Sequence, residues 1–170
     1  MQAGIYSNFA NNGTKFTFCV SSTMLTKNAN IDLATYTITI NVNTITTTAV
    51  GEELFHAYQN SVYPNGTAQY NPTGRVDIEF EQAFWQDIIQ TSVNAGAMNG
   101  ASQSDLDAYK IWIGSITNGD TIYPRSLSAA DQTQYNHFLY LYYQLHPTMG
   151  TPIYLTPQAV FSSFIYFGCK

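Results

Sequence analysis

The sequence predicts an α+β fold in which a small sheet is followed by a helix and a mainly helical remainder. Segments near the N-terminus alternate apolar and polar residues as strands do, whereas later segments repeat apolar residues at helical spacing. The order of strands, then helices, is typical of the α+β class. With 170 residues, 45% of them hydrophobic, and no internal repeat or low-complexity linker, we expect a single domain over 1–170.

Two segments near the N-terminus indicate strands. Thr14 to Val20 alternates in part, and Tyr36 to Val42 alternates cleanly, as expected of a half-buried strand. The stretch from Thr44 to Thr48 is rich in β-branched residues, and its secondary structure is ambiguous from the sequence. An antiparallel or mixed sheet is therefore expected before the first long helix.

Two helices follow in the middle of the chain. One is predicted from about Thr46 to Ser61, because Val50, Leu54 and Ala57 share one face. A loop rich in Pro and Gly comes next, and a second helix is expected from about Arg75 to Asn94. Its apolar residues fall on two opposite sides, so we expect it to be buried over most of its surface: Val76, Phe80, Ala83, Phe84 and Ile88, and Ile78, Trp85 and Ile89.

The C-terminal part is predicted to be helical with short connections. After a Gly- and Asn-rich loop from Asn94 to Gln103, Ser104 is expected to cap a helix that ends near Ile113. A turn is expected at Asn118-Gly119. The predicted helices that follow run from Ser128, as cap, to Leu145 before Pro147, and from Pro157 to Ile165.

Composition narrows the classes of function. Charged residues make up 10% and the net charge is -5, with no run of Lys or Arg, which excludes phosphate neutralisation and hence nucleic-acid binding. No apolar stretch reaches the roughly 18 residues of a membrane span, and the start from Met1 to Gly4 has no signal-peptide pattern. The uncharged polar surface fits an extracytoplasmic or secreted bacterial protein. Cys19 and Cys169 either form a disulfide in such a compartment or remain two buried thiols.

The run Gly51-Glu52-Glu53-Leu54-Phe55-His56-Ala57-Tyr58-Gln59 carries the strongest chemical signal. Glu52 and His56 are four residues apart, so they lie about 40° apart on one helix face and can share a metal ion. Glu53 lies beside them, where a general base could take a proton from a metal-bound water. On residue types alone, Glu-x-x-His is also common on ordinary helix surfaces.

A third ligand must come from elsewhere in the chain. Glu79 and Glu81 on the second helix are about 160° apart, so only one can face the first helix. We favour Glu79, because the small Ala83 one turn later on the same face allows the helices to approach closely. Asp77 and Glu81 are then expected to be exposed or hydrogen-bonded elsewhere.

From about Tyr36 to Ile89 the sequence resembles the zincin-like metallopeptidases with a Glu third ligand, the gluzincins, in particular small bacterial versions that read His-Glu-Leu-Phe-His-Ala-Tyr-Gln. The resemblance implies a zincin-like fold and hydrolysis of peptide bonds with zinc or another divalent metal. By position, His56 matches the second His ligand, Glu53 the catalytic Glu and Glu79 the Glu ligand. The first His of the motif is Glu52 here.

This replacement leaves three states of the site open: active with a Glu ligand, metal-binding but inactive, or empty. Carboxylate oxygen is an accepted zinc ligand, although two carboxylates make the site more anionic. The leading hypothesis is a metal-dependent peptidase acting on a peptide or protein substrate. The alternatives are an inactive relative that serves as a binding or structural module, and a toxin-like peptidase domain.

Other candidate groups carry weaker signals. His137 and His146 could stabilise a transition state, but His137 is expected to face solvent and His146 to end a helix. A phenol from the tyrosine-rich run could stabilise an oxyanion, but packing in the core and on the surface is the favoured explanation of this run: Tyr135, Tyr140, Tyr142 and Tyr143.

Overall fold

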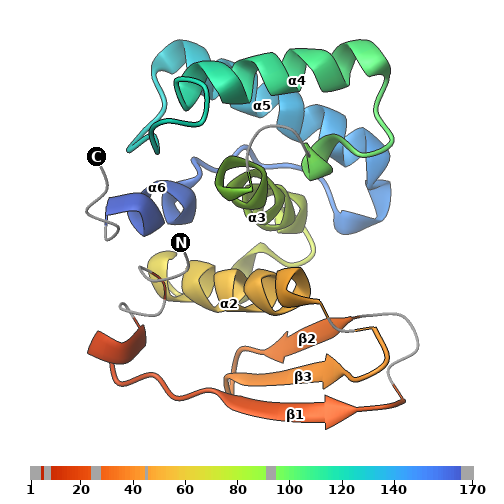
Figure 1. The fold of residues 1–170 in the computed structure, drawn as a ribbon, viewed down its shortest axis with the longest axis vertical. Coiled ribbons are helices and arrows are strands. Elements are labelled where there is room, and N and C mark those ends of the chain that lie inside the picture. The colour runs from red at the N-terminus through yellow and green to blue at the C-terminus, as the bar shows by residue number, and fades with distance from the viewer. Residues whose placement is uncertain (1–4, 6–8, 24–27, 45, 91–94, 166–170) are drawn as a thin grey trace.

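The structure is a computed structural model that describes residues 5, 9–23, 28–44, 46–90 and 95–165. A small sheet forms one end of the molecule, and successive helices are layered on it (Figure 1). Helix α2 lies directly on the sheet, α3 and α6 lie on α2, and α4 and α5 form the far end. The predicted α+β class, with the sheet first and the helices after it, is confirmed.

The sheet is mixed, with strand order β1-β3-β2. Strand β1 (Thr17–Ser21) is parallel to β3 (Thr37–Asn41), and β2 (Ala29–Asp32) is antiparallel to β3. The strand predicted from Thr14 begins three residues later, because pairing with β3 starts only at Thr17. Strand β2 was not predicted, since four residues with two apolar positions give too short an alternation.

Helix α2 (Thr47–Val62) agrees with the predicted helix to within one residue at each end. The Thr46 side chain caps it by accepting a hydrogen bond from the Ala49 amide at 3.1 Å. One side of α2 packs on β2 and β3, and the other side packs on α3 and α6. The charged side chains of its first two turns therefore lie at the boundary between the sheet and the helices.

Helix α3 (Arg75–Ile89) follows the short 3-10 turn η1 (Ala68–Tyr70) and is buried on both sides, as predicted. It ends before Asn94, so the predicted C-terminal boundary is wrong. Near the end of α3, Asp87 accepts hydrogen bonds from the amides of Gly96 and Ala97, which hold the turn η2 (Gly96–Met98) against the helix.

The remaining helices are α4 (Gln103–Ile116), α5 (Ala129–Leu145) and α6 (Gln158–Ile165), with the 3-10 turn η3 (Pro147–Met149) between the last two. The predicted cap of α4 is wrong: Ser102 accepts the hydrogen bond of the Asp105 amide, which leaves Ser104 inside the first turn. The helix also extends three residues past Ile113. The cap Ser128 and the full extent of α5 are confirmed.

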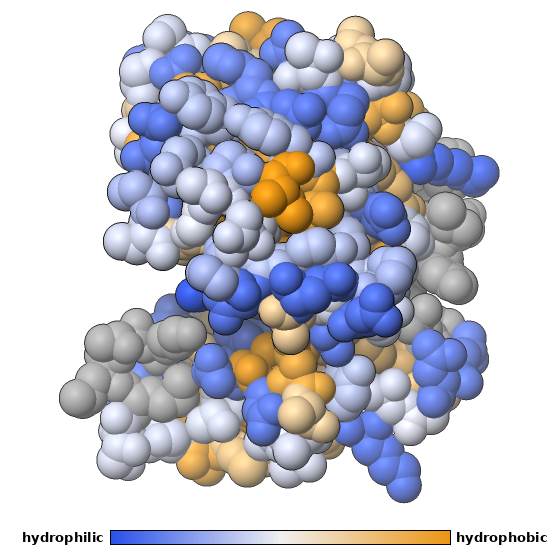
Figure 2. Space-filling view, turned by 180° about the vertical axis from the view of Figure 1, so that it is seen from behind, coloured by the Kyte–Doolittle hydropathy of each residue, from blue (hydrophilic) through white to orange (hydrophobic). Residues whose placement is uncertain are grey.

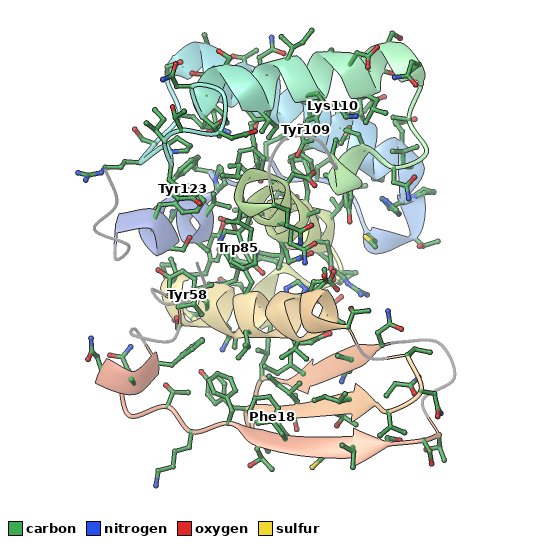
Figure 3. The ribbon with its side chains drawn as sticks, in the orientation of Figure 1. Phe18, Tyr58, Trp85, Tyr109, Lys110 and Tyr123 are labelled. Carbon is green, nitrogen blue, oxygen red and sulfur yellow. The ribbon has the colours of Figure 1, made fainter. Side chains whose placement is uncertain are left out.

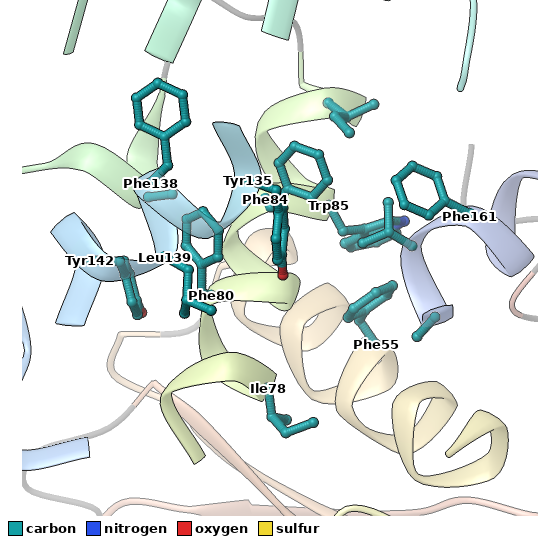
Figure 4. Close-up of a cluster of buried hydrophobic side chains, with 14 of the residues drawn as sticks. Phe55, Ile78, Phe80, Phe84, Trp85, Tyr135, Phe138, Leu139, Tyr142 and Phe161 are labelled. Atoms are coloured by element: carbon teal, nitrogen blue, oxygen red, sulfur yellow. The ribbon is translucent and has the colours of Figure 1, made fainter. Parts of the chain in front are cut away.

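The core is formed by aromatic and aliphatic side chains from α2, α3, α5 and α6 (Figure 4). Trp85 lies between α3 and α2 (Figure 3), and its ring stacks on Phe55 with centroids 4.5 Å apart. Phe84 stacks on Trp112 of α4 at 5.3 Å. This packing fixes α2 against α3 along their length, and that alignment positions the residues of the candidate site.

Within the described ranges, none of the helices combines the length and apolarity that crossing a bilayer requires. Cys19 is exposed on β1, so the alternative of two buried thiols is wrong for this residue. Cys169 lies outside the described residues, so the pairing of the two cysteines stays a prediction.

Candidate active site

A cleft of about 620 Å³ lies between the sheet and the helices. Strand β2 and the residue before it form one side, with η1 and Met149 at its margins. Helices α2 and α3 supply its ionisable acid, His and Arg side chains together with one glutamine: Glu52, Glu53 and His56, and Arg75, Glu79 and Gln82. The surface is hollowed between the same two parts of the molecule at the left edge of Figure 2. All four residues predicted for the site therefore line one cleft.

His56 and Glu79 form the centre of this lining. His56 Nε2 lies 3.5 Å from Glu79 Oε2, and the two side chains are 19% and 25% exposed. One comes from α2 and the other from α3, so the packing of these helices sets the distance. Glu81, two residues further along α3, does not face the cleft and is buried on another side of the helix.

The charge of Glu79 is stabilised by two neighbouring basic side chains, His56 and Arg75. Burial alone raises the pKa of this carboxyl, but the hydrogen bond and charge of His56 and the charge of Arg75 outweigh burial and lower it from 4.5 to about 2. Arg75 Nε lies 3.3 Å from Glu79 Oε1, one helical turn earlier on α3. Glu79 is therefore ionised throughout the neutral range.

The pKa of His56 is shifted in the opposite direction, upward. Burial lowers the pKa of this imidazole, but the hydrogen bond and charge of Glu79, with smaller contributions from Glu53 and Gln59, raise it above its usual 6.5. Its other ring nitrogen, Nδ1, lies 2.8 Å from Gln59 Oε1. Both nitrogens of the ring are thus engaged, one toward the cleft and one toward the helix interface.

Glu52, the predicted replacement for the first His ligand, lines the same cleft but contacts a different residue. Gln86 Nε2 of α3 donates a hydrogen bond to Glu52 Oε1 at 3.1 Å. Glu52 therefore contributes to the contact between the two helices near the start of α2.

Of the three predicted metal ligands, His56 and Glu79 approach each other. Two ligand atoms bound to one tetrahedral zinc ion at 2.0–2.1 Å are about 3.3 Å apart. The 3.5 Å between His56 Nε2 and Glu79 Oε2 matches that separation. Across the described residues, however, no three His, Cys, Asp or Glu side chains converge closely enough to hold a metal ion. The residue that is turned away is Glu52, toward Gln86.

Glu81 and Asp77 have structural partners, as expected for the acids that do not face the cleft. Glu81 is 1% exposed and accepts hydrogen bonds from four donors: Gln59 Nε2, Tyr63 Oη, and the amides of Ala159 and Val160. Asp77 accepts hydrogen bonds from the amides of Ile153 and Leu155. Both acids hold the C-terminal segment against α3.

Sequence reasoning missed several residues that line the cleft. Arg75, Tyr70 and Gln82 belong to it, as do Asn28 to Ile31 on and before β2. Helical spacing could have found Gln82, which lies one turn after Glu79, whereas β2 and Tyr70 gave no local signal. Neither the two other histidines nor the tyrosines of the run on α5 are among the lining residues.

Comparison with known proteins gave no relative: no family model matches the chain, and no curated protein or solved structure is significantly similar to it.

Proposed function

We propose that the protein is a divalent-metal-dependent peptidase of zincin-like architecture, with His56, Glu79 and Glu52 as metal ligands and Glu53 as general base. The observation that carries the proposal is the approach of His56 to Glu79, at a distance suited to two ligands of one ion, in a cleft that also contains Glu52 and Glu53. Zinc is the expected metal, and another divalent ion is compatible with the carboxylate-rich set.

The shape of the cleft supports a peptide as substrate. Its volume of about 620 Å³ falls within the range of ligand-binding sites. Strand β2 is at the edge of the sheet and lines the cleft, so an extended peptide can add to it through backbone hydrogen bonds. Ile31, Ile78 and Tyr70 add apolar surface for side chains of that peptide.

The residues would divide the chemistry as follows. A bound divalent cation would polarise the scissile carbonyl and acidify a water molecule. The Glu53 carboxylate would take a proton from the attacking water and later give it to the departing amine. Glu79 needs no deprotonation to act as a ligand, because its pKa is already about 2. His56 must be neutral at Nε2, so metal binding there competes with a proton.

Elemental analysis of protein that has not been exposed to chelator is the first test. We expect about one divalent metal per chain, lost in His56→Ala and retained in His137→Ala, since His137 is an exposed histidine of α5 outside the cleft lining. An unstructured protein should then be cleaved by the wild type and not by Glu53→Gln, which keeps the metal ligands. No metal after zinc is added back would overturn the proposal.

The second candidate is a catalytically inactive relative that acts as a binding or structural module of a secreted or envelope protein. The hydrogen bond from Gln86 to Glu52 favours it, because Glu52 there joins two helices. A module of this kind would bind peptide in the cleft without cleaving it, and Glu53→Gln would leave that binding unchanged. Cleavage by the wild type alone would exclude this candidate.

A further inference from the structure

We infer that strand β1 is a dimerisation edge, to which a second copy of this chain adds its own β1 in antiparallel register about a two-fold axis at Cys19. The two small sheets would then continue as one sheet across the dimer. The inference goes beyond the proposed function and does not depend on it, because β1 and the cleft-lining β2 are at opposite edges of the sheet.

The side chains of β1 extend the apolar face of the sheet beyond the part that α2 covers. Phe18 is paired with Ile38 of β3, which is fully buried, so both side chains point to the face on which α2 lies (Figure 3). Helix α2 packs on β2 and β3, and β1 is the strand beyond them. Phe18 and Val20 continue the same apolar face but are 55% and 76% exposed.

The outward-facing backbone groups of β1 belong to the same two residues. The Thr17 amide donates to the Tyr36 carbonyl, and the Ser21 carbonyl accepts from the Val42 amide, so these residues of β1 face β3. Because successive residues of a strand direct their amide and carbonyl to alternate sides, those of Phe18 and Val20 point to the outer edge. Within the described part of the chain, no strand pairs with that edge. An added strand can therefore bond to both residues.

The sequence of β1, Thr-Phe-Cys-Val-Ser, is self-complementary about its centre. Antiparallel pairing about Cys19 places Phe18 opposite Val20 of the second copy, and Thr17 opposite Ser21 of the second copy. Phe18 and Val20 then form hydrogen-bonded pairs, in which each pair exchanges two backbone hydrogen bonds. Cys19 meets Cys19 of the second copy at a position without such bonds, as its own amide and carbonyl face β3. This register uses every outward backbone group of the two apolar residues.

The same strand favours a second copy over an unrelated partner. The two-fold axis is perpendicular to the sheet, so Phe18 and Val20 of both copies meet on one face and form a single apolar cluster. Strand β1 contains no Asp, Glu, Lys or Arg, so two copies bring no like charges together there, although the chain carries a net charge of -5. Charged side chains and prolines are the usual protection of an edge strand against self-association, and β1 has neither.

Sedimentation equilibrium under reducing conditions tests the association. We expect the mass of the wild type to rise with concentration from 18.9 kDa to about twice that value. Val20→Lys should stay monomeric, because it places a charge in the apolar cluster. The matched control is Ile111→Lys, which changes an aliphatic side chain that is 74% exposed on α4 and should dimerise as the wild type does. A wild type that stays monomeric, or a dimer that survives in Val20→Lys, would overturn the inference.

Cysteine cross-linking in a Cys169→Ser background tests the register. The Cα atoms of the two Cys19 residues are expected about 4.5 Å apart, within the range that a disulfide spans. Diamide should therefore join the two thiols in one S–S bond, as it takes up their two protons and two electrons. When Cys19→Ser is combined with Ser21→Cys, the two thiols are about 14 Å apart along the strands and should stay unlinked. Equal cross-linking at both positions would overturn the two-fold register at Cys19.

Discussion

Helix α3 carries two glutamates, two residues apart, in opposite settings. Glu79 faces the cleft, is a quarter exposed, and pairs with His56 and Arg75. Glu81 is buried on another side of the helix and accepts four hydrogen bonds, none from a charged side chain. The pKa of Glu79 falls to about 2, whereas burial raises that of Glu81 to about 7 despite its hydrogen bonds.

This difference shows that the two sides of α3 make different kinds of contact. On the cleft side, the Glu79 carboxylate pairs with the side chains of His56 and Arg75 and remains partly accessible to solvent. The opposite side of α3 uses carboxylates as acceptors for backbone amides of the C-terminal segment, Glu81 for Ala159 and Asp77 for Ile153. Residue type alone does not separate these kinds of contact, so variants at the two positions should behave differently.

The largest expected effect is on stability at Glu81. Glu81→Ala leaves four donors without their acceptor in a buried site, and should lower the free energy of unfolding by about 3–5 kcal/mol. Glu79→Ala removes an ion pair that is in contact with solvent and should cost about 1 kcal/mol or less. Urea denaturation of metal-free protein measures both. Equal losses at the two positions would contradict the division of α3 into two sides.

The next effect is the stabilisation of the folded protein by zinc. At a free zinc concentration about 100 times the dissociation constant, the free energy of unfolding should rise by about 2.7 kcal/mol. Glu79→Gln should remove this gain, because it takes away one proposed ligand. The matched variant Glu81→Gln should keep it. A gain that survives in Glu79→Gln would place the metal elsewhere.

A smaller effect distinguishes the two glutamates by pH in chelator-treated protein. The pKa of Glu79 is lowered from 4.5, so its stabilisation is present above pH 4.5 and is lost as the pH falls toward 2. The pKa of Glu81 is raised from 4.5, so its contribution is present below pH 4.5 and is lost as the pH rises through about 7. The free energy of unfolding is measured as a function of pH. Its decline at acid pH should be absent in Glu79→Gln, and its decline toward pH 7 should be absent in Glu81→Gln. Two parallel profiles would contradict the opposite shifts.

The smallest effect is expected at Arg75. Its side chain is 47% exposed and pairs with Glu79 within one turn of α3, so solvent screens the interaction. Arg75→Ala should change the free energy of unfolding by less than about 0.5 kcal/mol, and the difference should shrink further at high salt. A loss comparable to that of Glu81→Ala would mean that the cleft side of α3 also has a large share in stability.

The parts of the fold set by local pattern could be predicted from the sequence. The alternation of Tyr36 to Val42, the helical spacing from about Thr46 to Ser61 and the cap Ser128 agree with β3, α2 and α5. Helical spacing and the small Ala83 favoured Glu79, which lines the cleft, but the premise that only one glutamate faces α2 is wrong, because Glu81 accepts a hydrogen bond from Gln59 of α2. Local pattern failed at β2, whose pairing with β3 is a tertiary contact. It also failed at the end of α3, near which Asp87 accepts hydrogen bonds from the amides of Gly96 and Ala97.

The site could be predicted only as far as single helices determine it. The spacing of Glu52, Glu53 and His56 depends on one helix, and all three line the cleft. The hydrogen bond between Glu52 and Gln86 depends on how two helices pack, which no spacing in the sequence encodes. The same holds for Gln59, whose three partners lie on two different helices.

The contacts of Asp77 and Glu81 with the C-terminal segment have a consequence for folding kinetics. They join residues that are 76 to 79 positions apart, so a long stretch of chain must be closed before either acid finds its amides. We expect these hydrogen bonds to form after the transition state. Their loss should therefore accelerate unfolding far more than it slows folding, so that Glu81 governs how long a folded molecule survives.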